Sequence, residues 1–524
     1  MSRDSPTSNE LLASYIEIYM QSANKSSQEI EAVFGNRISR IDFENVISKL
    51  KSLGFNNFES EGSYHLNIQN QFIDKRTGKT TIGNIRTTIS GISAIQEYCK
   101  TNTFDLDNPP RNITFMQKVS KIHADQRLPP IVYNDFGFKI NYKEEKILKA
   151  SFGIVRELLQ SWNQEKKIFR LIKRFTFKSA RFPSIKVDCS IVRSSKRVGK
   201  RLIPEYRIES SNVFKNPEQY EIEIEMDHNS SSTVDPEVKA KLIKQIRTAI
   251  KYVLSGLQQT NFPIGFGEQN GVLKNYMDIL YKGSPPDRRI RNRDFVGPSS
   301  ISLERPNIAP LQDDSVVPNI RMPYTVTEKA DGIRKLLFIN EKGKIYLIDV
   351  NMKIQFTGIV SKNKNLINTI LDGEHVLHDK FGAFINKYLA FDVYYIKKKD
   401  VRGKPFYISV DGDDADAMEK MTGRLVDLNK VIGELQLAPL IGAELPMTVD
   451  AKTFHISSNG PTMFKNCQTI ISRVDDDLFE YETDGLIFTP ADKGVGSSTV
   501  GEDLDPVKRT WTDHSNGSHQ NIIL

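Results

Sequence analysis

Residues 220–226, Tyr-Glu-Ile-Glu-Ile-Glu-Met, constrain the fold more than any other segment of this chain. Side chains alternate between the two faces of a β-strand, so these glutamates share one face and the isoleucines point away from it. Residues 28–34 repeat the pattern, and the glutamates concerned are Glu29, Glu31, Glu221, Glu223 and Glu225. Stacked carboxylates repel one another unless Mg²⁺, Mn²⁺ or a lining of lysine and arginine neutralises them. One such segment can be an exposed edge strand, but two favour a shared metal-binding face.

Basic residues alternate with apolar ones in other strand-like segments and offer neutralising charge. The phosphate-binding candidates on these segments are Arg86, Lys139, Arg174 and Lys186. A register slip of one residue would exchange the two faces of a strand, so the alternates are Arg170, Lys173 and Lys178. Between Glu165 and Arg207 there are fourteen Lys or Arg against three acids, about +11 in a chain of net charge +7. Such rows can be the solvated side of a sheet, but this charge density favours a polyanionic partner.

The chain length of 524 residues predicts two or three domains, each able to bury its own core. Apolar residues at helical spacing predict a helix over residues 236–257, and a turn-rich, basic connector follows it. We therefore expect a first domain over 1–255, a connector with the start of the second domain over 256–320, and the remainder of that domain over 321–524.

Several classes of protein are excluded by simple counts. No apolar run is long enough to cross a bilayer, and the amino terminus lacks a secretion signal, so no membrane partner is expected. The three cysteines are far apart in the sequence, which excludes a cysteine-based zinc cluster and indicates a reducing compartment. The glycines after residue 493 lack the Gly-Lys-[Ser/Thr] ending of a P-loop.

The segment 327–334, Thr-Glu-Lys-Ala-Asp-Gly-Ile-Arg, carries a lysine suited to covalent nucleotidyl transfer. A lysine amine attacks the α-phosphate of a nucleotide only when neutral, so Lys329 needs a desolvated or cationic neighbourhood, to which Arg334 would contribute. We expect Gly332 to allow a tight turn beside the phosphate. Taken alone, the four letters Lys-x-Asp-Gly are more simply a hairpin turn with a solvated lysine.

Three later segments change this interpretation, because each joins an apolar run to carboxylates. They are Leu-Asp-Gly-Glu at 371–374, Ala-Phe-Asp-Val-Tyr at 390–394, and Tyr-Glu-Thr-Asp-Gly-Leu-Ile-Phe-Thr-Pro at 481–490. With these motifs, residues 295–500 resemble the covalent nucleotidyltransferases, a superfamily of mRNA guanylyltransferases and polynucleotide ligases. The Asp-Gly-Leu-Ile-Phe-Thr-Pro string is similar to the guanylyltransferase branch.

The resemblance implies roles for individual side chains. Lys329 would form a phosphoramidate with GMP, Arg334 and Glu374 would hold the ribose, and Phe391 would stack on guanine. Glu482 and Asp484 would place the divalent metal beside the nucleotide. Alternatively, Phe391 is ordinary core and Asp372 an ordinary turn residue. The Lys-x-Lys strand that the superfamily places before an OB-fold lid has only Lys508-Arg509 as a poor counterpart, so we expect a chain truncated before that strand.

The glutamate rows facing basic rows make residues 1–255 similar to the RNA triphosphatases among the triphosphate tunnel metalloenzymes. That resemblance implies a closed antiparallel barrel of about eight strands, with the glutamates on the metal and the cations on phosphates. The expected fold class is therefore α+β, an antiparallel β tunnel followed by a nucleotidyltransferase domain with antiparallel sheets and flanking helices.

Both halves together resemble the mRNA capping enzymes of large DNA viruses. This resemblance implies an RNA 5′-triphosphatase and a guanylyltransferase that use Mg²⁺ or Mn²⁺ and GTP and act on the 5′ end of nascent mRNA. Transcription machinery or a methyltransferase would be partners, in the host cytoplasm or the virion. Two alternatives stay open, an ATP-dependent polynucleotide ligase and a non-catalytic subunit that binds RNA ends.

Overall fold

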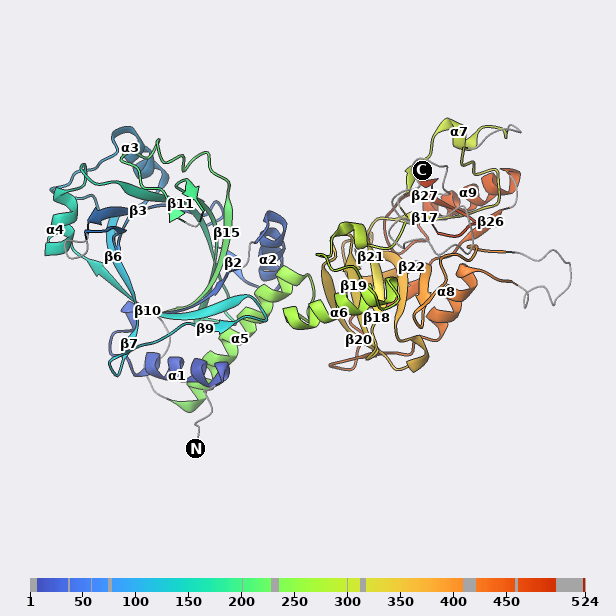
Figure 1. Cartoon of the computed structure of the whole chain (residues 1–524), viewed down its shortest axis with the longest axis horizontal. Helices are drawn as coiled ribbons and strands as arrows, with labels where there is room; N and C mark the ends of the chain where they lie inside the picture. Colours follow the sequence, from blue (N-terminus) through green and yellow to red (C-terminus); the bar gives the residue numbers. More distant parts are fainter. Residues whose placement is uncertain are drawn as a thin grey trace. The chain divides into compact units, whose positions relative to one another are not determined.

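A computed structural model describes residues 7–35, 38–57, 59–73, 78–199, 201–227, 235–298, 300–311, 317–408, 421–457 and 460–495, with the backbone of 522–523. The chain divides into two compact units, Met1–Gln259 and Thr260–Leu524 (Figure 1). No helix among the described residues is both long and apolar enough to cross a membrane.

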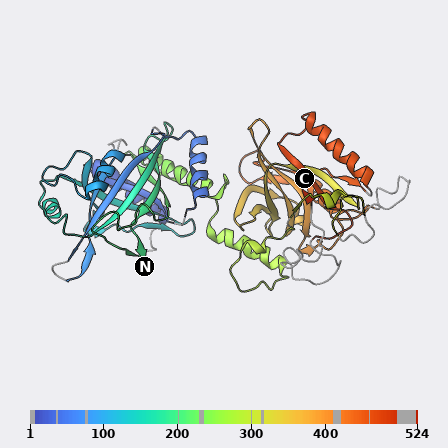
Figure 2. The same ribbon diagram turned by 90° about the horizontal axis from the view of Figure 1, so that it is seen from above.

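The first unit is a closed antiparallel barrel, seen in Figure 1 and from a perpendicular direction in Figure 2. Around the ring the strands are β1 (Gln28–Phe34), β10 (Phe138–Leu148), β6 (Ile113–Ser120), β5 (Ile85–Ser90), β3 (Ser63–Ile73), β11 (Lys167–Lys178), β12 (Ile185–Ser194) and β15 (Gln219–Met226). The pairing of β3 with β11 closes the ring, so none of these eight strands leaves a free edge. The predicted tunnel is thereby confirmed.

The polar face of this barrel points inward and its apolar face outward. In the pairing register Glu31 lies opposite both Asn141 and Glu225, so these side chains share the interior face. The alternate residues, such as Ile30 and Ile222, are buried on the outer face. Three helices cover that face, α1 (Ser8–Gln21), α2 (Arg40–Ser52) and α5 (Pro236–Gln258). Because polar side chains occupy the interior of the barrel, an apolar core lies between its outer face and these helices.

Helix α5 confirms the helix predicted over 236–257. It begins after Asp235, whose side chain accepts a hydrogen bond from Glu237 N, and Pro236 occupies its first turn. The other helices of the first unit are α3 (Ile92–Thr101) and α4 (Gly153–Gln160). Its shorter strands are β2 (Asn56–Asn57), β4 (Thr80–Ile82), β7 (Ile122–His123), β8 (Gln126–Arg127), β9 (Ile131–Tyr133), β13 (Arg197–Val198) and β14 (Arg201–Leu202).

The second unit contains a large sheet whose two faces are both covered. Its strands are β18 (Ile333–Ile339), β19 (Lys344–Asp349), β20 (Ile354–Ser361), β21 (Thr369–His378), β22 (Phe384–Ile396), β23 (Lys399–Asp400), β24 (Leu437–Pro439) and β25 (Thr448–Ala451). Leu336 and Phe338 belong to one core cluster with α6 (Phe266–Leu280), and Leu337 and Ile339 belong to another with α8 (Arg424–Gly433). A continuous apolar run is typical of a strand buried on both faces.

A smaller sheet lies beside the large one in the second unit. It consists of β16 (Ile301–Ser302), β17 (Tyr324–Ala330), β26 (His455–Ser457), β27 (Thr483–Pro490) and β28 (Ile522–Ile523), and α9 (Gly460–Asp475) packs on it. The short helix α7 spans Arg305–Ile308. Strand β17 ends at Ala330 and β18 begins at Ile333, so the chain passes from the small to the large sheet through Asp331 and Gly332. The Lys329 motif therefore joins the two sheets.

Candidate active sites

Lys118 is the centre of a cluster of carboxylates inside the barrel. Its ammonium pairs with Glu29, lies 3.0 Å from Glu31 Oε2, and lies 3.2 Å from Glu145 Oε1. Lys143 also pairs with Glu31, and Asn141 Nδ2 donates to Glu31 Oε1 at 2.9 Å. Strands β1, β6 and β10 thus bring acids and lysines together within the tunnel.

The acids of this cluster perturb one another, which shows how close they lie. Burial, reinforced by Glu31 and Glu225, raises the pKa of Glu29 to about 8. Glu31 is similarly buried, but Lys118 and Lys143 outweigh the burial and lower its pKa to about 2. Burial also raises the pKa of Glu223 and that of Glu225. Several buried carboxylates of the lumen therefore lie close enough to influence one another.

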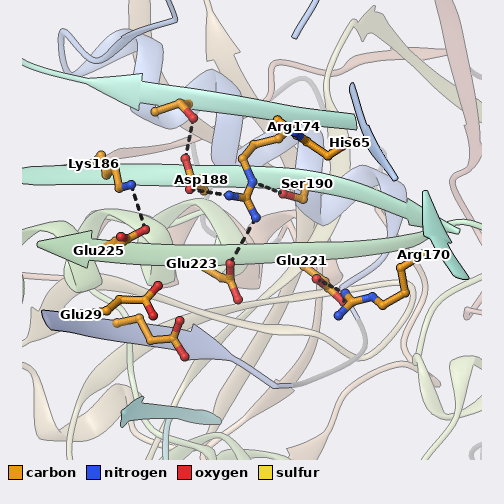
Figure 3. Close-up of polar contacts among 12 residues, drawn as sticks. Glu29, His65, Arg170, Arg174, Lys186, Asp188, Ser190, Glu221, Glu223 and Glu225 are labelled. Atoms are coloured by element: carbon orange, nitrogen blue, oxygen red, sulfur yellow. Dashed lines mark hydrogen bonds and ion pairs between the residues drawn. The ribbon is translucent and has the colours of Figure 1, made fainter. Parts of the chain in front are cut away.

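A second row of ion pairs lies on β11, β12 and β15 (Figure 3). Arg174 reaches Asp188 at 3.4 Å and Glu223 at 3.9 Å, and its Nε donates to Ser190 Oγ at 3.3 Å. Lys186 lies 3.0 Å from Glu225. Both predicted cations therefore lie in the lumen beside the predicted glutamates.

Two of the other tunnel predictions are placed differently. Glu221 is set apart from Glu29 in Figure 3, and both of its oxygens accept hydrogen bonds from Arg170, at 2.7 and 2.8 Å. Lys139 is exposed at the start of β10, opposite Val33, and no ion pair of the described residues includes it. Lys143, four residues further along the same face, takes the position that we expected of Lys139.

Of the three alternate phosphate-binding candidates, two face the lumen and one faces outward. Arg170 and Lys178 share the inner face with Arg174, and Lys178 pairs with Asp227 at 2.6 Å. Lys173 instead lies over the rings of Tyr64 and Phe175 on the other face.

Lys118 was missed by the sequence analysis. The alternation Thr-x-Met-x-Lys-x-Ser within β6 was the only signal for it, and a single lysine gives no charged row.

The lumen offers carboxylate oxygens, which are donors of the type that Mg²⁺ and Mn²⁺ prefer. Among the described residues no three acids, histidines or cysteines already converge on a common point as a cation cage would require. Glu29 and Glu31 are turned toward Lys118. The donor chemistry therefore fits a divalent cation, and that cation would compete with Lys118 for the same oxygens.

The second site is a cavity of about 160 Å³ between the two sheets of the second unit. Its polar and aromatic lining includes Thr327, Lys329, Asp331, Arg334, Glu374, Phe391, Lys452 and Phe454. Strands β17, β18, β21 and β22 each contribute a predicted residue. The structure thus brings Lys329, Arg334, Glu374 and Phe391 together.

A bulge in β27 directs Asp484 toward Lys329. The pairing of β17 with β27 shifts between Glu328, which lies opposite Leu486, and Ala330, which lies opposite Thr483. Gly485, at φ +146°, supplies the backbone freedom for the extra residue. The Asp484 carboxylate forms an ion pair with the Lys329 ammonium as a result.

Arg334 is held rigidly at the wall of the cavity. Its Nε lies 3.1 Å from Asp372 Oδ1, and its Nη1 donates to Pro298 O at 2.6 Å. Tyr394 fixes Asp372 in turn through a hydrogen bond of 2.6 Å. The guanidinium lies 5.8 Å from the ring centre of Phe391. Asp372 is therefore a buried residue that fixes the position of Arg334, and not an ordinary turn residue.

Phe391 and Asp392 point to opposite sides of β22. Phe391 is partly exposed at the cavity, whereas Asp392 is buried and accepts a hydrogen bond from Arg424 Nε at 2.9 Å.

Glu482 is placed differently from our expectation. Its side chain is exposed and does not line the cavity, and its backbone oxygen accepts from Asp331 N at 2.9 Å. Of the two acids predicted to place the metal, only Asp484 contacts Lys329.

Lys452 is a second cation of this cavity that the sequence analysis missed. It is 5% exposed, its Nζ donates to the backbone oxygen of Glu328, and it lies 3.3 Å from that residue's carboxylate. Burial lowers the pKa of Lys452. The sequence signal was weak, because Lys452 follows β25 in a segment without a charged row or repeated motif.

Glycine is required at two positions of the motifs for close packing. Gly332 lies at the bend between β17 and β18 without a positive φ, and a Cβ there would lie 2.7 Å from Glu374 Cγ. At Gly373 a Cβ would lie 2.5 Å from Tyr388 Cζ and 2.6 Å from Leu389 O. Both glycines let neighbouring strands approach closely at the cavity.

We expect Gly373→Ala to lower the free energy of unfolding by about 1–3 kcal/mol, because overpacking forces shifts in a fixed environment. Tyr388 cannot move easily, since its hydroxyl donates to Lys335 O at 2.8 Å. Urea denaturation followed by circular dichroism measures this effect. Gly433→Ala is the matched control, because no atom of the part of the chain that the structure describes lies within 4 Å of a Cβ at Gly433. Equal effects of both substitutions would contradict the packing argument.

We expect Glu374→Gln to stabilise the ligand-free protein at pH 8 by about 1–3 kcal/mol. Burial raises the pKa of Glu374 from its ordinary value of 4.5 to about 7. A raised carboxyl pKa means that the folded state loses stability as pH rises from 4.5 to about 7, and the loss persists above that range. Thermal unfolding at pH 5 and pH 8 should show a larger gain at pH 8. A gain independent of pH would exclude this cause.

The sequence of residues 267–504 matches the family model described as "mRNA capping enzyme, catalytic domain". A probable mRNA-capping enzyme of Acanthamoeba polyphaga mimivirus is 24% identical over 241 residues, which are 45% of this chain and 16% of that protein. The mRNA-capping enzyme of Caenorhabditis elegans is 31% identical over 152 residues, which are 26% of this chain and 23% of that protein. The chain therefore spans less than a quarter of the length of either relative.

A solved structure of the RNA triphosphatase domain of a trifunctional mimivirus mRNA capping enzyme is also similar. It matches with a TM-score of 0.31 and 16% sequence identity, over 47% of this chain and 96% of that domain. The closed barrel itself is established by the strand pairing within this chain.

Proposed function

We propose, because residues 267–504 match the family model of the mRNA capping enzyme catalytic domain, that this chain caps RNA at two active sites. The tunnel would remove the γ-phosphate of a triphosphate-ended RNA, and the cavity of the second unit would transfer GMP to the resulting diphosphate end. The observation that carries the proposal is the convergence of Lys329, Arg334, Glu374 and Phe391 on one cavity within the family segment.

In the tunnel, the proposed roles follow charge. Arg86, Arg174 and Lys186 would bind phosphate oxygens of the triphosphate, and this positions the γ-phosphate for attack by water. Glu29, Glu31, Glu223 and Glu225 would hold Mg²⁺ or Mn²⁺, which offsets phosphate charge and activates water. Lys118 links this acidic group to the basic lining, since it contacts Glu29 and Glu31 and lies beside Arg86.

In the cavity, the Lys329 amine would attack the α-phosphorus of GTP. The nitrogen–phosphorus bond forms as the bond to pyrophosphate breaks, and the ammonium proton leaves first, with the paired Asp484 carboxylate as its nearest acceptor. An oxygen of the RNA diphosphate end then attacks the same phosphorus, the nitrogen–phosphorus bond breaks, and Lys329 regains a proton. Phe391 would stack on guanine, while Arg334 and Glu374 would hold the ribose.

Two assays test the proposal. Incubation with α-labelled GTP or ATP and a divalent cation should attach label to the protein from GTP and not from ATP. Label from ATP alone would replace guanylyl transfer by a ligase-type activity. Release of inorganic phosphate from triphosphate-ended RNA tests the tunnel, and its absence would leave the first unit a non-catalytic binder of RNA ends.

The proposal includes the setting in which such an enzyme works. A mimivirus protein is among the similar sequences, and we place the activity at nascent viral mRNA in the host cytoplasm or the virion. Transcription machinery or a methyltransferase would be its partners there, and GTP its second substrate.

A further inference from the structure

A polar pocket of about 170 Å³ opens in the tunnel wall beside the carboxylates. The polar side chains that line it are Asn67, Gln69, Asn84, Arg86, Lys118 and Arg170. Lys118 belongs both to the pocket and to the carboxylate cluster, because it also pairs with Glu29 and Glu31. A ligand whose terminal phosphate lies at those glutamates would therefore extend past Lys118 into this pocket.

The pocket differs from a simple phosphate site because half of its polar lining is carboxamide. Gln69 Nε2 donates to Gly83 O at 2.9 Å, which leaves the Gln69 carbonyl oxygen as an acceptor. Thr88 Oγ1 donates to Asn67 Oδ1 at 2.9 Å, which leaves the Asn67 amide nitrogen as a donor. A phosphate offers only acceptors, whereas a hydroxyl both donates and accepts. One free donor beside one free acceptor is thus suited to sugar hydroxyls.

The cations of the pocket are unequally engaged. Arg170 is held by Glu221 through two hydrogen bonds. Arg86 Nη2 contacts the weakly accepting Met116 sulfur at 2.9 Å, and Glu145 is 4.0 Å away. Its Nε is buried without a hydrogen-bond partner among the described residues. Arg86 is therefore the guanidinium of this pocket that an added anion would satisfy best.

We propose that this pocket binds the first nucleotide of the triphosphate substrate. Asn67 and Gln69 bind its ribose hydroxyls, and Arg86 binds its α-phosphate. The inference rests on the proposed function of the tunnel. It adds the direction in which the bound RNA lies along the tunnel. The γ-phosphate lies at Glu29 and Glu31, and the RNA body leaves past Asn84, which is exposed at the pocket's edge.

The test compares the parent protein with Asn67→Ala and Gln69→Ala on three compounds. Two are substrates, a short triphosphate-ended RNA and the same oligonucleotide with a 2′-deoxy first residue. The third, inorganic tripolyphosphate, is measured as a competing inhibitor of phosphate release. Gln96→Ala is the matched control, because Gln96 is exposed on α3 outside the barrel.

We expect the parent to prefer the all-ribose substrate, and at least one variant to lose about fivefold in kcat/KM on it, as for one neutral hydrogen bond. That variant should lose less on the 2′-deoxy substrate, and the inhibition constant of tripolyphosphate should stay unchanged, which also shows that the tunnel is folded.

Two outcomes overturn the proposal in distinguishable ways. If the parent releases no phosphate at all, the proposed function fails and takes the nucleotide pocket with it. If the parent is active but both variants match it, lose equally on the two oligonucleotides, or bind tripolyphosphate more weakly, the pocket assignment alone is wrong.

Discussion

A Lys329→Arg variant is expected to lose covalent labelling from α-labelled GTP by about 1,000-fold or more, as for removal of a covalent nucleophile. Arginine keeps the positive charge and can still pair with Asp484, so the cavity should stay intact. Its guanidinium remains protonated at any ordinary pH and offers no lone pair to the α-phosphorus. Denaturing gel electrophoresis after incubation with labelled GTP measures the loss.

The matched control for this variant is Lys362→Arg. Lys362 is exposed in the same unit and does not line the cavity, so its substitution should leave labelling unchanged. Thermal unfolding of both variants should agree with the parent to within a degree or so. If Lys329→Arg took up guanylate as readily as the parent, another residue would have to be the nucleophile and the proposed chemistry of the cavity would be wrong.

A Glu31→Gln variant is expected to release phosphate from triphosphate-ended RNA about 100-fold more slowly or worse, because a metal-site carboxylate supplies several kcal/mol. Glutamine keeps the shape of the side chain and an acceptor for Asn141. It removes the charge that a divalent cation would need and that now engages Lys118 and Lys143. A phosphate-release assay over a series of Mn²⁺ concentrations measures both the rate and the metal requirement.

Loss of stability must be separated from loss of catalysis in this experiment. Lys118 and Lys143 lower the pKa of Glu31 to about 2, so its ionised form stabilises the folded state above the ordinary carboxyl pKa of 4.5, and this contribution is lost as pH falls toward 2. Glu31→Gln should therefore unfold at a lower temperature than the parent near neutral pH. Glu44→Gln, an exposed control on α2, should change neither stability nor activity appreciably. A folded Glu31→Gln variant with the rate of the parent would remove Glu31 from the catalytic site.

The sequence predicted the charged faces of the strands because alternation is a local property, whereas the closed barrel was expected from the family resemblance. In β1 and β15 the period of two fixes which residues share a face, whatever strands lie next to them. It could not predict which lysine meets Glu31. Lys139 and Lys143 lie on the same face of β10, and the pairing register alone places Lys143 opposite Glu29 and Lys139 opposite Val33.

The cavity of the second unit likewise combines residues that the sequence predicted with contacts that only the tertiary structure determines. Motif residues on regular strands, such as Lys329 and Glu374, line it as expected. Glu482 and Asp484 are two residues apart, and a bulge at Gly485 decides that Asp484 contacts Lys329. Lys452 arrives from a segment more than a hundred residues away in the sequence from Lys329, and no local pattern announces such a contact.

By itself the sequence therefore determined the kinds of side chain available and the face of each strand that carries them, because both follow from residue chemistry and backbone geometry over a few residues. The tertiary structure alone decided which charges meet, as for Lys118 with Glu29 and for Arg170 with Glu221. Those contacts depend on strand register, bulges and ring closure, which are fixed only when strands distant in the sequence pair.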